Sequence, residues 1–222
     1  ALMKHAVGEE IIAIDPTVDV KLVTPKTKGF RTWTEDEITK FEERHPLGSR
    51  ARLALALLLY TGQRRSDVVR MGKQHIREDA IDVRQQKTGT ELSIPIHPEL
   101  RAVINATEAG HLTFLVTKDG APFSPAGFTN WFRHVCNEAG LRGFSAHGLR
   151  KASMTRLAEA GCSVHEIAAF SGHKTLSEIA HYTRSVEQAA LAREAMAKAR
   201  TKLSKSVGLT VKNRKKANEN KS

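Results

Sequence analysis

Residues 49–64, SRARLALALLLYTGQR, decide the fold of this chain. Ser49 is of a residue type that caps helix starts, and the eight residues from Leu53 to Tyr60 are apolar on nearly every side of a helix. A helix that is apolar all round is buried, whereas a surface helix has one polar face. Eight residues are also far fewer than the roughly 20 that a membrane-spanning helix requires. The stretch therefore predicts a globular core around one central helix, and no membrane segment.

On the N-terminal side, a second helix is predicted to begin near Thr34. Thr34 and Glu37 have the spacing of a capping box. Residues 15–29, DPTVDVKLVTPKTKG, have the Pro, Thr, Lys and Gly content of a linker, and residues 1–14 resemble the end of a helix. We therefore expect a domain boundary near residue 30.

On the C-terminal side, the chain shows one β region followed by helices. Residues 80–86 (AIDVRQQ) and 91–96 (ELSIPI) are strand-like runs, and the Gly-containing segment between them predicts a hairpin. Helix start signals then recur at Ser124-Pro125 and in the capping boxes Ser163/Glu166 and Thr175/Glu178. With the glycines that end helices, they predict helices over residues 98–107, 125–140, 146–160 and 186–203, and short ones on either side of SGHK. The predicted fold class is mainly α with a small antiparallel β-sheet (α+β).

The positive charge of the chain is high but unevenly placed. The 222 residues carry a formal net charge of +11, which makes a polyanion the first partner to consider. Residues 193–222 supply +8 of this charge, and residues 1–192 supply only +3. Basic tails of this kind are commonly solvated and disordered, so we expect the specific function to lie in the body of the chain.

The cysteine pattern indicates the compartment. Cys136 and Cys162 lie 26 residues apart, with no CxxC and no cluster of Cys and His. Neither a disulfide framework nor a zinc site is therefore predicted. We expect a reducing, intracellular location in the cytoplasm, and no cofactor or metal.

Four short segments follow one another in a recognisable order. They are Thr61-Gly62-Gln63-Arg64, Lys87 in the hairpin, His147-Gly148-Leu149-Arg150, and Ser171-Gly172-His173 followed nine residues later by Tyr182. Together they resemble the tyrosine recombinases, also called the phage-integrase family, over about residues 30–190. The resemblance implies the catalytic-domain fold of that family and its chemistry of DNA strand breakage and rejoining.

By this resemblance, the arginines and histidines bind the scissile phosphate of a DNA strand. Arg64 and Arg150 hold it, because a guanidinium offers a planar set of donors and stays charged at any working pH. His147 acts as a general acid or base or orients the phosphate, and it shares a helix face with Arg150 if the helix has begun by His147. His173 adds a hydrogen bond. Without the family, both arginines are expected as solvated cations, Arg64 alternatively as a partner of Asp67, and His173 as a capping or packing residue.

The two remaining residues, Tyr182 and Lys87, are implied to take part in forming and breaking the phosphoester bonds. The resemblance assigns Tyr182 as the nucleophile that forms a 3′-phosphotyrosyl link, and Lys87 as the mobile hairpin lysine that protonates the 5′ oxygen. The link stores the energy of the phosphodiester, so neither ATP nor a metal is required. Arg84 and Lys73 are neighbouring cations that compete with Lys87 for this assignment. Tyr60 ends the apolar run and is expected in the core.

The resemblance also implies a domain organisation and partners. Residues 30–192 are expected to be the catalytic domain, residues 1–29 the end of an N-terminal core-binding domain and its linker, and residues 193–222 the end of a C-terminal helix and a basic tail. The family acts on double-stranded DNA as homo-tetramers on paired sites. Residues 186–203 are the candidate helix for docking on a neighbouring subunit, with packing on its own subunit as the alternative. With so little of a core-binding domain, residues 1–222 are expected to bind DNA weakly.

The leading hypothesis is a site-specific DNA recombinase or integrase of a phage or another mobile element. A type IB topoisomerase-like enzyme would use the same chemistry to relax supercoils, but the TGxR and HxLR segments are more similar to recombinases. A DNA-binding module with relic catalytic residues is the third hypothesis. The presence of all six residues argues against it.

Overall fold

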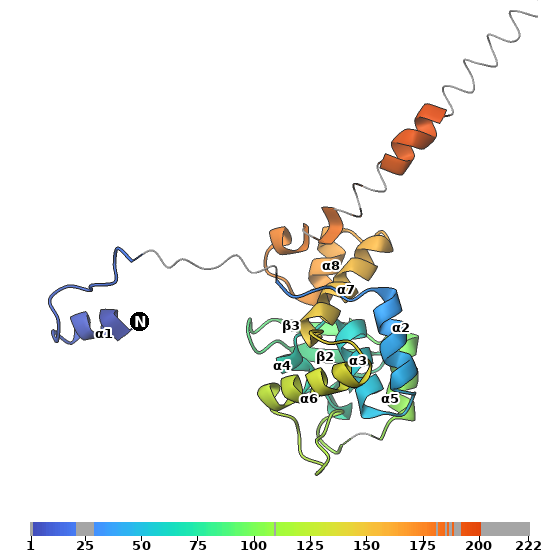
Figure 1. The fold of residues 1–222 in the computed structure, drawn as a ribbon, viewed down its shortest axis with the longest axis horizontal. Coiled ribbons are helices and arrows are strands. Elements are labelled where there is room, and N and C mark those ends of the chain that lie inside the picture. The colour runs from blue at the N-terminus through green and yellow to red at the C-terminus, as the bar shows by residue number, and fades with distance from the viewer. Residues whose placement is uncertain are drawn as a thin grey trace, which may run out of the picture.

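The computed structural model describes residues 2–20, 29–108, 110–180, 182–184, 186, 188 and 192–200. It is mainly helical with one three-stranded sheet, which confirms the predicted fold class (Figure 1). The helices are α1 (Leu2–Gly8), α2 (Glu35–Arg44), α3 (Arg50–Thr61), α4 (Arg65–Val68), α5 (Pro98–Ala106), α6 (Pro125–Glu138), α7 (Ala146–Glu159) and α8 (Val164–Ser171), with a short 3-10 helix η1 (Lys73–His75). Residues 176–180, 182–184 and 192–200 are also helical. In these described ranges, no helix is both long and apolar enough to cross a bilayer.

Helix α3 forms the centre of the core. Its residues from Leu53 to Leu59 are all buried, and it packs against α5 and α7. The hydroxyl of Ser49 accepts a hydrogen bond from the backbone N–H of Arg52 at 3.2 Å, as expected of a helix cap. The prediction of one buried central helix is confirmed.

The helix starts agree with their capping signals. At α2, the Thr34 hydroxyl accepts from the Glu37 N–H at 3.4 Å, and the Glu37 carboxylate accepts from the Thr34 N–H at 2.9 Å. Ser163 and Glu166 form the same reciprocal pair at α8. The prediction for residues 1–14 is wrong in its extent, because α1 ends at Gly8 and Glu10 has a left-handed φ of 55°, which a helix cannot contain.

The sheet supports the hairpin that carries Lys87. Strands β1 (Ile76–Arg77), β2 (Ala80–Arg84) and β3 (Glu91–Pro95) pair antiparallel in the order β1-β2-β3. Ile81 faces Ile94 across β2 and β3, and both side chains are buried. The two-stranded hairpin was predicted, but β1 was not, because two residues are too few to show an alternating pattern.

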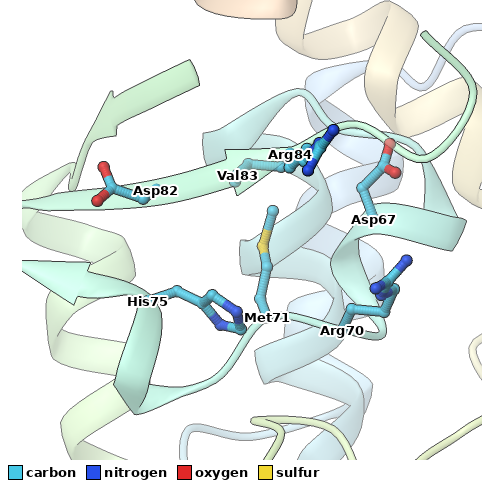
Figure 2. A pocket seen from close by; sticks show the side chains of 7 residues that line it. All are labelled: Asp67, Arg70, Met71, His75, Asp82, Val83 and Arg84. Carbon is cyan, nitrogen blue, oxygen red and sulfur yellow. The ribbon is translucent and has the colours of Figure 1, made fainter. Parts of the chain in front are cut away.

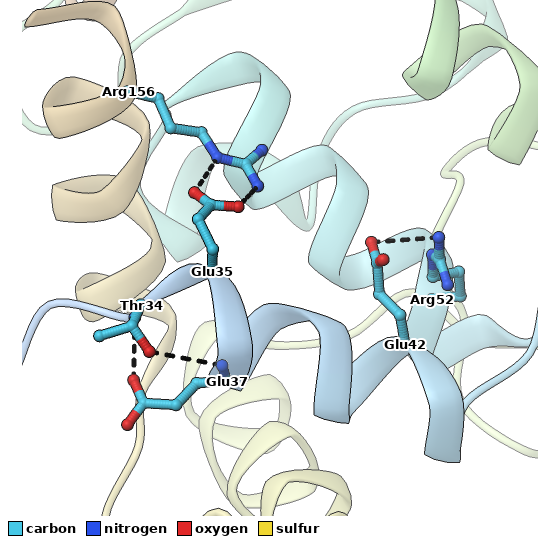
Figure 3. A network of polar contacts seen from close by, with 6 residues as sticks. All are labelled: Thr34, Glu35, Glu37, Glu42, Arg52 and Arg156. Carbon is cyan, nitrogen blue, oxygen red and sulfur yellow. Dashed lines mark hydrogen bonds and ion pairs between the residues drawn. The ribbon is translucent and has the colours of Figure 1, made fainter. Parts of the chain in front are cut away.

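Ion pairs join α2 to the rest of the core (Figure 3). The Arg156 guanidinium on α7 donates to both carboxylate oxygens of Glu35, at 2.7 and 2.5 Å. Glu42 lies 3.1 Å from the guanidinium of Arg52 on α3. Such partly exposed pairs contribute little stability each, and they link α2 to α7 and to α3.

Trp33 begins the buried part of the structure and packs against the start of α7. It is 3% exposed, its ring centre lies 5.1 Å from that of Phe144, and its indole N–H donates to the Ser145 carbonyl at 3.0 Å. Gly148 on α7 lies directly beneath it. A Cβ on Gly148 would come within 2.2 Å of the Arg31 carbonyl oxygen and 2.8 Å of the Trp33 ring, so only glycine fits here.

We expect Gly148→Ala to destabilise the fold by about 1 to 3 kcal/mol, because the new methyl group must displace backbone or the indole ring. Urea unfolding followed by tryptophan fluorescence measures this change. Gly8→Ala is the matched control, since a Cβ there meets nothing within 4 Å. Equal unfolding midpoints for the Gly148 variant and the parent would contradict the packing.

Candidate active site

Four of the six predicted residues line one cavity of about 240 Å³. Arg64 lies at the N-cap position of α4, Lys87 lies in the turn between β2 and β3, and His147 and Arg150 belong to α7. Because α7 begins at Ala146, His147 and Arg150 share a face of the first turn, as predicted. The other lining residues are Arg65, Ser66, Gln86, Pro125 and Ala146.

Arg150 is a buried cation that donates only to neutral acceptors. It is 3% exposed, and its Nη1 donates to the Gly62 carbonyl. Its Nη2 donates to the Ser171 carbonyl at 3.2 Å and to Nε2 of His173 at 3.1 Å. Burial and the charge of Arg64 lower the pKa of Arg150 to about 10, which still leaves it protonated at neutral pH. None of the ion pairs among the described residues includes it, so its charge is available to an anion in the cavity.

Arg64 also has a neutral partner. Its side chain is half-buried, and Nη1 donates to Oε1 of Gln85 at 3.2 Å. The Asp67 carboxylate instead accepts from the backbone N–H of Gln86 at 2.8 Å. The structure therefore gives no hydrogen bond or ion pair between Arg64 and Asp67 and places a second guanidinium at the cavity.

The hydrogen bonds of His173 define its tautomer. The Ser171 hydroxyl donates to the Ile167 carbonyl at 2.6 Å, and its oxygen lies 2.5 Å from Nδ1 of His173. A hydroxyl has only one proton, so Ser171 must accept from an N–H at Nδ1. Nε2 then carries the lone pair that accepts from Arg150. His173 is thus bonded both to Ser171, the last residue of α8, and to Arg150.

Both histidines are neutral at pH 7. Burial, together with the charges of Arg150 and Arg64, lowers the pKa of His173 to about 4. Desolvation lowers the pKa of His147, with added contributions from Arg150 and Lys151. A neutral imidazole can accept a proton, which a general base requires.

We expect the protein to lose stability as the pH falls from about 6.5 towards 4. The unfolded chain protonates His173 near its usual pKa of 6.5, whereas the folded state does so only near 4. The folded state therefore binds fewer protons than the unfolded chain in this pH window. The stability that neutral His173 contributes is complete above about pH 6.5 and is lost as the pH falls towards 4. Urea midpoints at several pH values measure the loss. A His173→Gln variant should lose less than the parent, and identical pH profiles would contradict the lowered pKa.

Tyr182 is half-buried beside Arg150. Its ring packs against the small apolar cluster of Met154, Ile167 and Ile179, which joins α7, α8 and the helical residues 176–180. Burial raises the pKa of Tyr182, although the charge of Arg150 acts in the opposite direction. The phenol is therefore protonated at neutral pH, and a nucleophilic role would require that its proton be taken up.

Lys87, and neither competing cation, lines the cavity. Lys87 is exposed in its turn. Arg84 lies 3.8 Å from Glu91 and lines a separate hollow of about 130 Å³ between α4 and β2 (Figure 2). Lys73 lies exposed in η1. Tyr60, as expected, packs partly buried against the core, with its ring stacked on His97 at 4.6 Å.

Comparison with known proteins identifies the family. A sequence profile described as "Phage integrase family" matches residues 32–189, which is well over half of the chain. The chain belongs to the phage integrase family.

Individual relatives agree with this assignment. The integrase of Escherichia phage HK022 is 27% identical over 150 residues, which cover 63% of this chain and 42% of that protein, so the chain spans less than half of its relative. A lambda integrase dimer bound to a COC′ core site matches with a TM-score of 0.66 at 23% identity. The match covers 81% of this chain and 68% of the lambda integrase chain. A lambda integrase tetramer bound to a Holliday junction has a TM-score of 0.65 at 25% identity, with coverages of 79% and 56%. The lambda integrase fold is therefore shared.

Three polar residues near the candidate site were assigned no supporting role from the sequence. They are Asp67, Gln85 and Ser171, all buried. Asp67 points from α4 toward the loop after β2, as Figure 2 shows, and its Oδ2 is the one buried side-chain oxygen or nitrogen without a hydrogen bond among the described residues. Its negative charge raises the pKa of Arg150 and so offsets part of the positive cluster. A sequence signal existed for Gln85, because alternation along β2 puts it on the same inward face as Ile81 and Val83.

Proposed function

We propose that the protein cleaves and rejoins DNA as a site-specific recombinase or integrase, through a 3′-phosphotyrosyl intermediate. The observation that carries this proposal is the buried guanidinium of Arg150, which has no carboxylate partner in the described structure and lies beside Arg64 at a cavity. A buried charge without a counter-ion is costly unless its function is to bind one. A phosphodiester supplies the matching negative charge and accepts hydrogen bonds from two planar guanidiniums.

The proposed reaction exchanges one phosphoester for another. The Tyr182 oxygen attacks phosphorus, a P–O bond to tyrosine forms, and the P–O5′ bond breaks. His147, neutral at pH 7, takes the tyrosine proton, and Lys87 gives a proton to the departing 5′ oxygen. Arg64 and Arg150 stabilise the charge on the non-bridging oxygens, and His173 helps to orient Arg150. Attack by a 5′ hydroxyl on the phosphotyrosine reverses every step and rejoins the strand.

These side chains supply both the charge and the proton transfers, so the proposal includes no ATP and no metal. Cleavage is accordingly expected to continue in the presence of a chelator. The activity is proposed for the bacterial cytoplasm, where the DNA substrate lies.

The proposed partner is double-stranded DNA, bound by a homo-tetramer on paired sites. Residues 192–200 of the C-terminal helix are all exposed, whereas Val186 packs against the apolar cluster of Met154, Ile167 and Ile179. This exposure favours docking on a neighbouring subunit, as the tetramer proposal requires. Residues 201–222, predicted to form a basic tail, lie outside the described residues, and the division into residues 1–29, 30–192 and 193–222 stays a prediction.

Trapping the covalent intermediate tests the proposal without knowledge of the target site. The protein is incubated with short duplexes that have a randomised core and a nick in one strand. Cleavage just before the nick releases a short fragment, which diffuses away and leaves the protein attached to the 3′ end. Complexes that survive denaturant are isolated and sequenced. We expect an enriched sequence joined to Tyr182, whereas a topoisomerase-like enzyme would enrich little and a DNA-binding module would give no covalent product.

A further inference from the structure

Gln85 lies where the Lys87 turn meets the two arginines. It follows β2 directly, and its side chain is 1% exposed. Its backbone closes the turn, because its N–H donates to the Thr90 carbonyl at 2.9 Å and its carbonyl accepts from the Gly89 N–H at 2.8 Å. Lys87 therefore lies within a loop whose base is Gln85.

The amide of Gln85 uses all of its hydrogen-bonding capacity. Oε1 accepts from Nη1 of Arg64 at 3.2 Å and from the Thr88 hydroxyl at 2.7 Å. Nε2 donates to Oε1 of Gln63 at 2.7 Å and to the Ser171 carbonyl at 2.8 Å. An amide has two acceptor sites and two donor hydrogens, so every one is occupied. These four bonds join the turn, the start of α4, and the end of α8.

The Ser171 carbonyl connects Gln85 to the second arginine as well. It accepts from Gln85 at 2.8 Å and from Nη2 of Arg150 at 3.2 Å. One amide therefore touches Arg64 directly and Arg150 through a shared acceptor, while it holds Thr88, the residue after Lys87.

The packing admits a glutamine and few alternatives. Gly172 has a left-handed φ of 69°, and a Cβ on it would lie 2.5 Å from Nε2 of Gln85. Glutamate would place an acceptor against the Ser171 carbonyl, which is also an acceptor, and asparagine is shorter by one C–C bond of about 1.5 Å. Both would leave buried polar groups without partners.

We infer that Gln85 is a positioning residue that fixes the Lys87 turn against Arg64 and Arg150. The inference rests on the proposed function, in which Lys87 must reach the 5′ oxygen of the phosphate that both arginines hold. Because the amide contacts the turn and the arginines at once, it sets the distance between proton donor and phosphate. Its loss therefore impairs protonation of the leaving group more than binding of the phosphate.

A sulfur-for-oxygen substitution in DNA separates these effects. In a duplex with a 5′-bridging sulfur at the scissile phosphate, the P–S bond breaks and a thiolate leaves, which needs no proton because thiols have a pKa of about 8.5. We expect Gln85→Met to slow cleavage of the all-oxygen duplex by about 100-fold, as displacement of a catalytic group by about 1 Å can do. On the sulfur duplex it should cleave nearly as fast as the parent. Lys87→Ala should show the same rescue, and Arg150→Ala should not.

The controls separate positioning from folding. Gln74→Met replaces a surface glutamine that donates to the Leu112 carbonyl at 2.7 Å, and it should cleave both duplexes like the parent. Thr88→Val removes the bond between the turn and the amide, together with the bond within the turn that the Thr88 hydroxyl accepts from the Thr90 hydroxyl at 3.0 Å. It leaves the other three bonds of the amide in place, so it should show a smaller defect with the same rescue. It replaces Gln85→Met if that variant does not fold. Equal slowing of both duplexes by Gln85→Met, or no slowing, would overturn the inference.

Hydrogen exchange provides a measurement that does not depend on cleavage. In Gln85→Met, the amide of Gly89 should exchange about tenfold faster, a change expected from the loss of one or two hydrogen bonds, while α5 is unaffected. Unchanged exchange at the turn would overturn the inference. If the parent forms no covalent product on any duplex, the proposed function fails, and the exchange result still decides whether Gln85 fixes the turn.

Discussion

Tyr182→Phe should abolish the covalent protein–DNA product, with a loss on the order of 10⁴-fold or more, because the variant lacks the oxygen that bonds to phosphorus in the proposed reaction. The ring packs against Met154, Ile167 and Ile179, and phenylalanine keeps this packing. Folding should therefore be preserved while the reaction is lost. The measurement is the amount of denaturant-resistant product on the selected nicked duplex.

Tyr60→Phe is the matched control, since Tyr60 is the other tyrosine of the chain. Its ring stacks on His97 at 4.6 Å and lies 5.9 Å from the Arg156 guanidinium, against the core. This variant should form the product like the parent. A product that persists in Tyr182→Phe would show that another residue is the nucleophile.

Arg150→Ala should reduce the cleavage rate by about 100-fold to 1,000-fold, the range seen when one stabilising donor is removed from a reacting oxyanion. Arg150→Lys should recover only part of this loss, because an ammonium retains the charge but not the planar pair of donors. Single-turnover rates at saturating DNA measure the chemical step. Methylguanidinium added to the alanine variant should restore part of the rate, because it can occupy the vacated space.

Arg156→Ala provides the comparison on the same helix. Arg156 forms its ion pair with Glu35 at the surface, so this variant should change stability slightly and leave the cleavage rate unchanged. Near-parental cleavage by Arg150→Ala would contradict the proposed role of the buried guanidinium.

The parts of the fold that depend on local chemistry could be predicted from the sequence. Thr34 with Glu37 and Ser163 with Glu166 marked helix starts, because their capping bonds join residues three apart. The hairpin followed from two alternating runs on either side of a turn with glycine. Helix α1 was overextended because only the backbone reveals the left-handed turn at Glu10.

The candidate site was predictable in its residue types and order, but not in its connections. Arg64, Lys87, His147 and Arg150, selected by the family resemblance, line one cavity, and their catalytic roles stay a prediction. Their supporting bonds join residues far apart in the chain: Gln85 to Ser171 spans 86 positions, and Arg150 to Gly62 spans 88. No local sequence pattern identifies hydrogen-bond partners so far apart in the chain. A glutamine at an inward-facing strand position indicates only that its amide has some buried hydrogen-bond partner.

The neutral partners of Arg150 have a consequence for the cell. Its three acceptors belong to Gly62, Ser171 and His173, which come together only when α3, α7 and α8 are all in place. A nascent or partly unfolded chain lacks this arrangement. In the proposed function, such a chain would not hold a phosphate for attack, so DNA cleavage would begin only after the elements that also reseal the strand have assembled.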